Sequence, residues 1–209
     1  MKKLLGMICM LPLVTAGFGE AEGKGVSDSN KQPEIKMEHS AALRLSGPFF
    51  SHMVGDLKGF KKELEKGNPN AYEWANKQFG TILMVTTWMG KTDYMEALLE
   101  TGAFTDAANN FGRPPLVLAA TRGHLDAVKL LLKHKANIDA TIITFDRDSG
   151  YTALHAAARA GHADIVSYLL EQKADAKLKT RFGYTAFELA QHYKRNDVIV
   201  ALAKHGVTE

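Results

Sequence analysis

The chain has 209 residues, of which 45% are hydrophobic and 23% are charged. These proportions are those of an ordinary globular protein and exclude disorder along the whole chain. The formal net charge is only +3 and the basic residues are scattered, so composition gives no sign of nucleic-acid binding. The single cysteine, Cys9, excludes an intramolecular disulfide.

Residues 1–16 have the three-part pattern of a secretory signal peptide. Lys2 and Lys3 precede an apolar run over residues 4–14, which is too short to cross a bilayer as a helix, and Ala16 completes a cleavage site. One alternative is a lipoprotein signal at Cys9, but most of the apolar run follows Cys9. The other is a buried N-terminal helix of the fold. The short basic region is typical of bacteria, so we expect a periplasmic protein that has lost its only thiol.

Residues 17–43 are mostly polar and contain several glycines and serines. Such a segment buries too little apolar surface to offset the entropy lost on ordering. We therefore interpret it as a flexible leader that tethers the rest of the chain, and a binding role is the alternative.

The remainder of the chain repeats. Stretches that begin at Gly112, Gly150 and Gly183 align with one another, and a small turn marks each unit. Successive turns are 35, 33, 38 and 33 residues apart. The turns are Gly55-Asp56, Gly90-Lys91, Gly123-His124, Gly161-His162 and Lys194-Arg195, and twelve positions after each stands Gly67, Gly102, Lys135, Lys173 or Gly206. A period of this length indicates a repeat protein.

Each unit has the pattern of two short helices. In the fourth unit, residues 154–160 offer small side chains where neighbouring units must pack closely, and residues 163–172 carry apolar side chains at helical spacing. Neither helix can bury its apolar side alone, so the units must stack. The predicted fold class is an all-α solenoid of about five helix-turn-helix repeats.

Residues 150–162, Gly-x-Thr-Ala-Leu-His-x-Ala-Ala-x-x-Gly-His, resemble the ankyrin repeat. The resemblance covers roughly residues 44–209 and implies loop or hairpin fingers that project between the repeats. It predicts repeats at about 44–75, 76–108, 109–146, 147–179 and 180–209. The first unit lacks the Thr-Pro-Leu-His entry, and the fifth has Glu188 for the histidine, as expected of terminal repeats that meet water on one side.

His155 invites a catalytic interpretation, with His162 and Asp164 nearby in the sequence. The resemblance implies instead that the His155 imidazole ties neighbouring turns together through hydrogen bonds, and it places His124 and His162 in turns between helices. No HExxH, GxSxG or phosphate-binding glycine loop occurs in the sequence. We therefore expect a protein that is not an enzyme, with no catalytic residue, metal or cofactor.

The resemblance places binding on the concave surface, which is made by the first helices and the fingers. The corresponding positions are rich in Trp, Tyr, Phe and Arg, the types that dominate binding hot spots. The candidate contact residues are Trp88, Met89, Phe111, Arg113, Arg122, Tyr151, Arg159, Phe182, Tyr184, His192 and Tyr193. The alternative for Phe111 and Phe182 is that each folds back against its own repeat.

The 38-residue spacing marks a five-residue insertion in the finger between the third and fourth units. Its β-prone segment 141–145 predicts an extended hairpin that pushes some of Ile142, Ile143 and Phe145 towards solvent, where they would contact a partner. The alternative is that they pack on adjacent fingers. The loop of the first unit, with Tyr72 and Trp74, is a second aromatic candidate.

The predicted function is that of an exported protein-binding module, monomeric when unbound, whose partner is a folded periplasmic enzyme. We expect no nucleic-acid partner and no membrane insertion after signal cleavage. The chain resembles exported bacterial ankyrin proteins, some of which inhibit the producer's own peptidoglycan-cutting enzymes in an immunity role. The alternatives are a support factor for a periplasmic enzyme such as a catalase, and an effector released towards a host cell.

Overall fold

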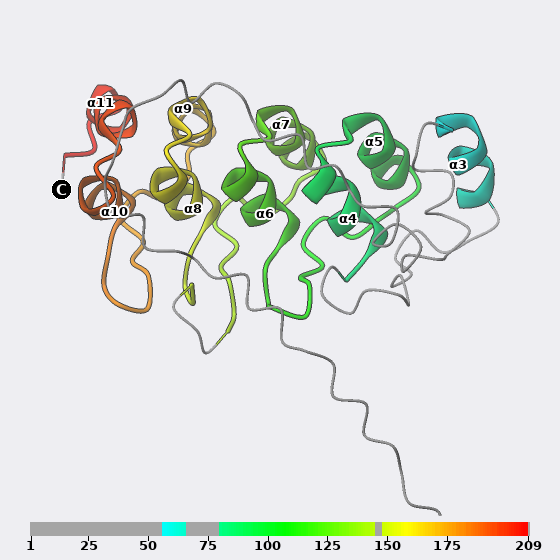
Figure 1. Ribbon diagram of the computed structural model, residues 1–209, viewed down its shortest axis with the longest axis horizontal. Helices are drawn as coiled ribbons and strands as arrows, with labels where there is room; N and C mark the ends of the chain where they lie inside the picture. Colours follow the sequence, from blue (N-terminus) through cyan, green and yellow to red (C-terminus); the bar gives the residue numbers. More distant parts are fainter. Residues whose placement is uncertain (1–55, 66–79, 145–147, 209) are drawn as a thin grey trace, which may run out of the picture. The chain divides into compact units, whose positions relative to one another are not determined.

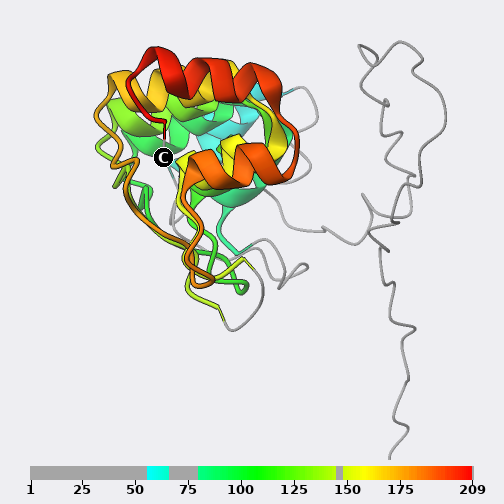
Figure 2. The ribbon, with the colours of Figure 1, turned by 90° about the vertical axis from the view of Figure 1, so that its left-hand side faces the viewer.

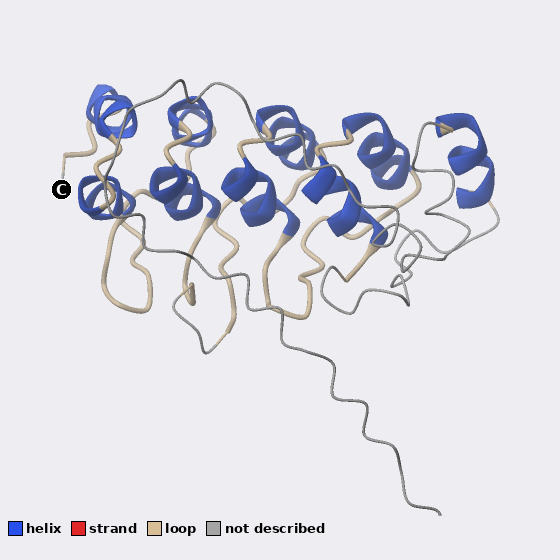
Figure 3. Ribbon diagram, viewed as in Figure 1, coloured by secondary structure: helices blue, strands red, loops and turns tan. Residues whose placement is uncertain are grey.

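The structure is a computed structural model that describes residues 56–65, 80–144 and 148–208. Every regular element in these ranges is an α-helix of seven to nine residues (Figure 3), so the predicted all-α class is confirmed. The helices are α3 (Leu57–Leu64), α4 (Ile82–Met89), α5 (Thr92–Glu100), α6 (Pro115–Arg122), α7 (Leu125–Lys133), α8 (Ala153–Ala160), α9 (Ala163–Glu171), α10 (Ala186–His192) and α11 (Asn196–Lys204).

The helices pack in two rows (Figure 1). In the inner row α4, α6, α8 and α10 each pack against the next, and in the outer row α3, α5, α7, α9 and α11 do the same. The inner helix of each pair also packs on the outer helix that follows it, and Figure 2 shows the two rows end on. Because the main contacts join neighbours, the solenoid prediction is confirmed.

Local sequence determines where the inner helices begin. The Thr152 hydroxyl accepts from the His155 N–H at the start of α8, and the Thr185 hydroxyl accepts from the Glu188 N–H at the start of α10. Each cap satisfies a helical N–H that has no partner within the helix. Helix α6 begins instead with Pro115 in its first turn, where a missing N–H costs nothing.

The turn between the two helices of a repeat is bonded to the preceding repeat. The side chain of the turn residue reaches the carbonyl near the end of the previous inner helix: His124 to Trp88 at 3.3 Å, His162 to Thr121 at 3.4 Å and Arg195 to Arg159 at 3.0 Å. The His162 ring lies against Gly123, which has a φ of 78°, so a side chain there would be both strained and crowded. These bonds hold the repeats in register.

The core follows the repeat period. At one position of successive outer helices stand the buried leucines Leu98, Leu131, Leu169 and Leu202. The inner helices contribute buried alanines, among them Ala119, Ala120, Ala157, Ala158 and Ala190. Small side chains allow the inner helices to approach closely, while the leucines fill the space between the rows.

Several predictions concern parts of the chain that lie outside the described residues. These are the signal peptide, the leader, the start of the first repeat, the loop with Tyr72 and Trp74, and Phe145. Within the residues that are described, none of the helices is long and apolar enough to cross a membrane.

Candidate protein-binding surface

Three fingers lead into the inner helices, and we name each after the helix it precedes. They are the α6 finger (residues 103–114), the α8 finger (described residues 136–144 and 148–152) and the α10 finger (174–185). In Figure 1 they project on the same side of the inner row. The binding face is defined here as these fingers together with α4, α6, α8 and α10.

The finger tips expose aromatic and aliphatic side chains. Phe111 on the α6 finger is 47% exposed, Ile143 on the α8 finger 83%, and Phe182 on the α10 finger 61%. Neither Phe111 nor Phe182 is buried against its own repeat. Tyr184, also on the α10 finger, is exposed as well. Apolar side chains displayed on successive projecting loops are typical of a surface that buries them against another protein.

Hydrogen bonds between fingers hold these tips in place. The Ile143 N–H donates to the Gly112 carbonyl at 3.1 Å, and the Arg181 N–H donates to the Ser149 carbonyl at 3.1 Å. Gly112 has a φ of 62°, and a Cβ there would collide with the Ile143 carbonyl, so this approach requires glycine. A partner therefore meets a braced backbone, which lowers the entropic cost of binding.

Two further bonds join the finger bases. The Asn137 N–H donates to the Asp106 carboxylate at 3.0 Å, and the Asp175 N–H donates to the Asp139 carboxylate at 3.1 Å. Both bonds link one finger to the next, so the three fingers form a connected layer rather than independent loops. This layer carries the exposed tips.

Ile142 and Tyr151 do not belong to the exposed surface, and their inclusion among the contact residues is corrected here. Ile142 is 4% exposed and Tyr151 is 7% exposed. The Ile142 N–H donates to the Tyr151 carbonyl at 2.9 Å, which closes the predicted hairpin of the α8 finger although no strand is formed in its described residues. Side chains alternate along an extended segment, so Ile142 points into the core and Ile143 points out.

Arg113 and Arg159 support the fingers from within. Both bind the Asp148 carboxylate, Arg113 through Nη2 and Arg159 through Nη1 at 2.7 Å. Burial works against the charged form of Arg159, but the Asp148 charge and hydrogen bond outweigh it and raise the pKa of this guanidinium. Burial also raises the pKa of Tyr151, which lies 5.7 Å from Arg159. This cluster joins the α6 finger, the α8 finger and helix α8.

The inner helices present two stacked pairs of arginine with an aromatic ring. Arg122 lies over the Trp88 ring at 4.8 Å, and Arg159 lies over the Tyr193 ring at 5.5 Å. Each pair joins the ends of two successive inner helices, and such stacking stabilises both partners. Arg122 and Tyr193 are exposed, whereas Trp88 is half-buried.

The remaining candidates lie at the two ends of the face. Met89 is half-buried and packs against the core at the end of α4. His192 is exposed at the end of α10, with its ring 4.9 Å from that of Tyr193 and 6.4 Å from that of Tyr184. These three rings form an exposed aromatic cluster beside the α10 finger.

His155 has the structural role that the resemblance implied. Its Nδ1 accepts from the Thr152 N–H at 3.3 Å and lies 2.8 Å from the Thr152 hydroxyl, and its Nε2 lies 3.0 Å from the Leu178 carbonyl. Burial lowers the pKa of this imidazole, so it is neutral at pH 7. The side chain thus fastens the α10 finger to α8.

Phe104 was missed by reasoning from the sequence. It is 67% exposed at the base of the α6 finger. The equivalent positions of the next two repeats hold Asn137 and Asp175, both polar. A large apolar residue at a position that is otherwise polar was the signal that could have found it.

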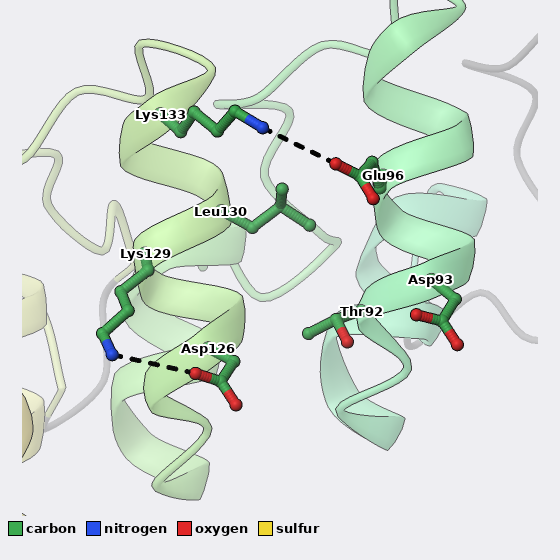
Figure 4. A pocket seen from close by; sticks show the side chains of 7 residues that line it. All are labelled: Thr92, Asp93, Glu96, Asp126, Lys129, Leu130 and Lys133. Atoms are coloured by element: carbon green, nitrogen blue, oxygen red, sulfur yellow. Dashed lines mark ion pairs between the residues drawn. The ribbon is translucent and has the colours of Figure 1, made fainter.

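A shallow groove lies on the opposite side, between α5 and α7 (Figure 4). It measures about 240 Å³ and is lined by Thr92, Asp93, Glu96, Asp126, Lys129, Leu130 and Lys133. Lys133 reaches across from α7 to Glu96 on α5 at 3.6 Å. A charged, open groove lacks the apolar enclosure of a small-molecule site. Among the residues that the structure describes, no three His, Cys, Asp or Glu side chains gather as metal ligands would.

Two family models match the chain. One, described as ankyrin repeats (3 copies), matches residues 53–142, and the other, described as ankyrin repeats (many copies), matches residues 116–170. The chain belongs to the ankyrin-repeat family. Ankyrin repeats are generally non-catalytic modules of protein interaction, so the family indicates a protein-binding module.

Three curated proteins share part of this ankyrin-repeat sequence. The chain is 46% identical over 81 residues to mouse ankyrin repeat and SAM domain-containing protein 6, and 34% identical over 120 residues to the mouse B-cell lymphoma 3 protein homolog. It is 37% identical over 126 residues to the Drosophila melanogaster ankyrin repeat and KH domain-containing protein mask. The matches cover 39%, 57% and 56% of this chain but only 9%, 26% and 3% of those proteins.

Proposed function

We propose that this ankyrin-repeat chain is exported and binds a cell-envelope enzyme through its binding face, thereby inhibiting or sequestering it. The observation that carries the proposal is the row of exposed apolar tips, Phe111, Ile143 and Phe182, on fingers that hydrogen bonds hold together. Large exposed apolar side chains on a fixed backbone supply binding energy at low entropic cost.

Export is supported by the signal-peptide pattern of residues 1–16. It is tested by fractionating cells that produce the full chain or a chain lacking residues 2–16. We expect the full chain in the periplasmic fraction, shortened at its N-terminus, and the truncated chain in the cytoplasm. An uncleaved full-length chain in the cytoplasm would overturn this part of the proposal.

Inhibition is the form of binding that projecting fingers support best. A finger with an apolar tip can enter an enzyme's cleft and exclude its substrate, and an exported enzyme that cuts peptidoglycan endangers the cell that makes it. Such a partner gives the protein a self-protective, immunity-like role. The proposal predicts that deleting the gene leaves the enzyme unrestrained and causes lysis. Loss of the partner's activity on deletion would favour the support-factor role instead.

The binding test uses a triple variant, Phe111→Ala/Ile143→Ala/Phe182→Ala, and a control, Val200→Ala. Val200 is an exposed apolar residue on α11, away from the fingers. Each chain is immobilised, envelope extract is passed over it, and the peptidoglycan-cleaving activity of each retained protein is measured with and without the chain.

We expect the wild type and the control to retain an enzyme and reduce its activity, and the triple variant to retain none. A retained protein whose activity is unchanged would refute inhibition. Equal retention by the triple variant would refute the binding face.

A further inference from the structure

The carboxylates of the binding face form hydrogen bonds within the chain. Each accepts hydrogen bonds from the backbone or from an arginine of the same chain: Asp106 from Asn137, Asp139 from Asp175, Asp148 from Arg113 and Arg159, Asp175 from Lys177, and Glu188 from Thr185. The two guanidinium groups offset the charge of Asp148, whereas a backbone N–H orients a carboxylate without removing its charge.

Three cations of the same face differ from Arg113 and Arg159, which are paired with Asp148. Arg122, Lys177 and Lys179 are exposed, and none forms an ion pair with any described residue. Lys177 and Lys179 lie on the α10 finger, which also carries Phe182. Arg122 is stacked on Trp88, and stacking leaves the edge of a guanidinium available to a carboxylate.

Two of the outer helices are acidic, whereas α3 and α7 carry more lysines than carboxylates. Helix α5 carries Asp93, Glu96 and Glu100 and no basic residue, and α9 carries Asp164 and Glu171 and no basic residue. Over the described residues of the binding face the charges nearly balance, with six arginines and lysines against five carboxylates. The positive excess lies on the α10 finger, where Lys177, Lys179 and Arg181 stand against Asp175. A local excess of this kind attracts a negatively charged partner to the α10 finger.

We propose that the α10 finger and its neighbours bind an acidic protein segment that carries apolar side chains. This inference rests on the proposed protein-binding function and specifies the chemistry of the partner. The partner's carboxylates meet Lys177, Lys179 and Arg122, while its apolar side chains cover Ile143 and Phe182. Apolar burial supplies most of the affinity, and the charges determine which segments are accepted.

The test uses two synthetic fluorescent peptides of equal length with the same leucine and phenylalanine positions. One has glutamate and the other lysine at every remaining charged position. Binding to the full chain is measured by fluorescence anisotropy at low and at high salt. We expect the glutamate peptide to bind, the lysine peptide to bind about tenfold more weakly or not at all, and the difference to shrink in high salt.

Two double variants with equal changes in net charge locate the effect. Lys177→Glu/Lys179→Glu alters the α10 finger, and the control Lys62→Glu/Lys204→Glu alters exposed lysines of α3 and α11. In the finger variant, we expect the ratio of the affinities for the glutamate and lysine peptides to fall by about tenfold. In the control, we expect this ratio to stay unchanged.

Equal binding of the two peptides, binding of neither, or an equal effect of the two variants would overturn the inference. The proposed function fails separately, because it requires an enzyme to be retained from envelope extract. If an enzyme is retained equally well by the wild type and by Lys177→Glu/Lys179→Glu, that result would agree with the proposed function and would refute the inference that the partner segment is acidic.

Discussion

Replacing His155 with glutamine should make the stability of the protein less dependent on pH. His155 is 1% exposed, and its neutral ring serves both the Thr152 N–H and the Leu178 carbonyl. Burial lowers the pKa of its imidazole below the ordinary value of 6.5, so the unfolded state binds a proton more readily than the folded state. The contribution of His155 to stability is therefore fully present above about pH 6.5 and is lost as the pH falls below it.

The size of the effect follows from the bonds involved. Loss of one partner of a buried hydrogen bond costs about 1–3 kcal/mol, so we expect His155→Gln to destabilise the protein by about 1–3 kcal/mol at pH 8. At pH 5 the wild type has lost much of this advantage, and the gap between the two proteins should narrow.

The measurement is equilibrium urea unfolding of both proteins, followed by circular dichroism at pH 8, 6.5 and 5. The difference between the two unfolding free energies isolates His155, because all other titrating groups are common to both. A difference that stays constant or widens as the pH falls would refute the assignment of a buried, neutral His155.

Two further predictions concern stability. Lys135 and Lys173 follow α7 and α9 with positive φ values of 65° and 68°, a backbone conformation that favours glycine. Replacing either lysine with glycine should therefore stabilise the protein by up to about 1 kcal/mol, measured as a higher midpoint of urea unfolding. A lower midpoint would contradict this backbone geometry. Asp148→Asn leaves Arg113 and Arg159 without their shared carboxylate and should lower the free energy of unfolding by about 1–2 kcal/mol. The loss is smaller than for a fully buried ion pair, because all three side chains are partly exposed. An unchanged midpoint would show that the cluster does not brace the fingers.

Much of the fold could be predicted because its information is local. A repeat period, a turn residue and an apolar position each recur in neighbouring units, and each unit packs mainly on the next. The role of His155 was predicted in the same way, since the repeat itself determines which carbonyl the imidazole reaches. The lysines at positions 135 and 173 were recognised as equivalents of Gly102, and the structure shows the left-handed backbone that this equivalence implies.

The orientation of side chains on the long finger could not be predicted from sequence. Residues 141–145 were recognised as β-prone, but the choice between Ile142 and Ile143 as the exposed residue depends on register. That register is set by bonds to Gly112 and Tyr151, which belong to another finger and to the far side of the same finger. The sequence pattern predicts that neighbouring side chains point to opposite sides, but it does not determine which of Ile142 and Ile143 faces solvent.

The arginines posed a different difficulty. Arg113 and Arg159 appeared equally available as contact residues, but folding brings both to Asp148, which is 35 residues from the first and 11 from the second. An ion pair between such distant positions has no local signal. Arg122, by contrast, keeps an exposed side chain, and only its stacking on Trp88 was not foreseen.

The central claim is that the finger tips form the surface that contacts the partner. The most direct measurement places a photoactivatable phenylalanine analogue at position 182 or at position 200 of the full chain and irradiates living cells of the producing organism. We expect a cross-linked envelope enzyme from position 182 and none from position 200. A cross-link from position 200 with none from position 182 would contradict the account.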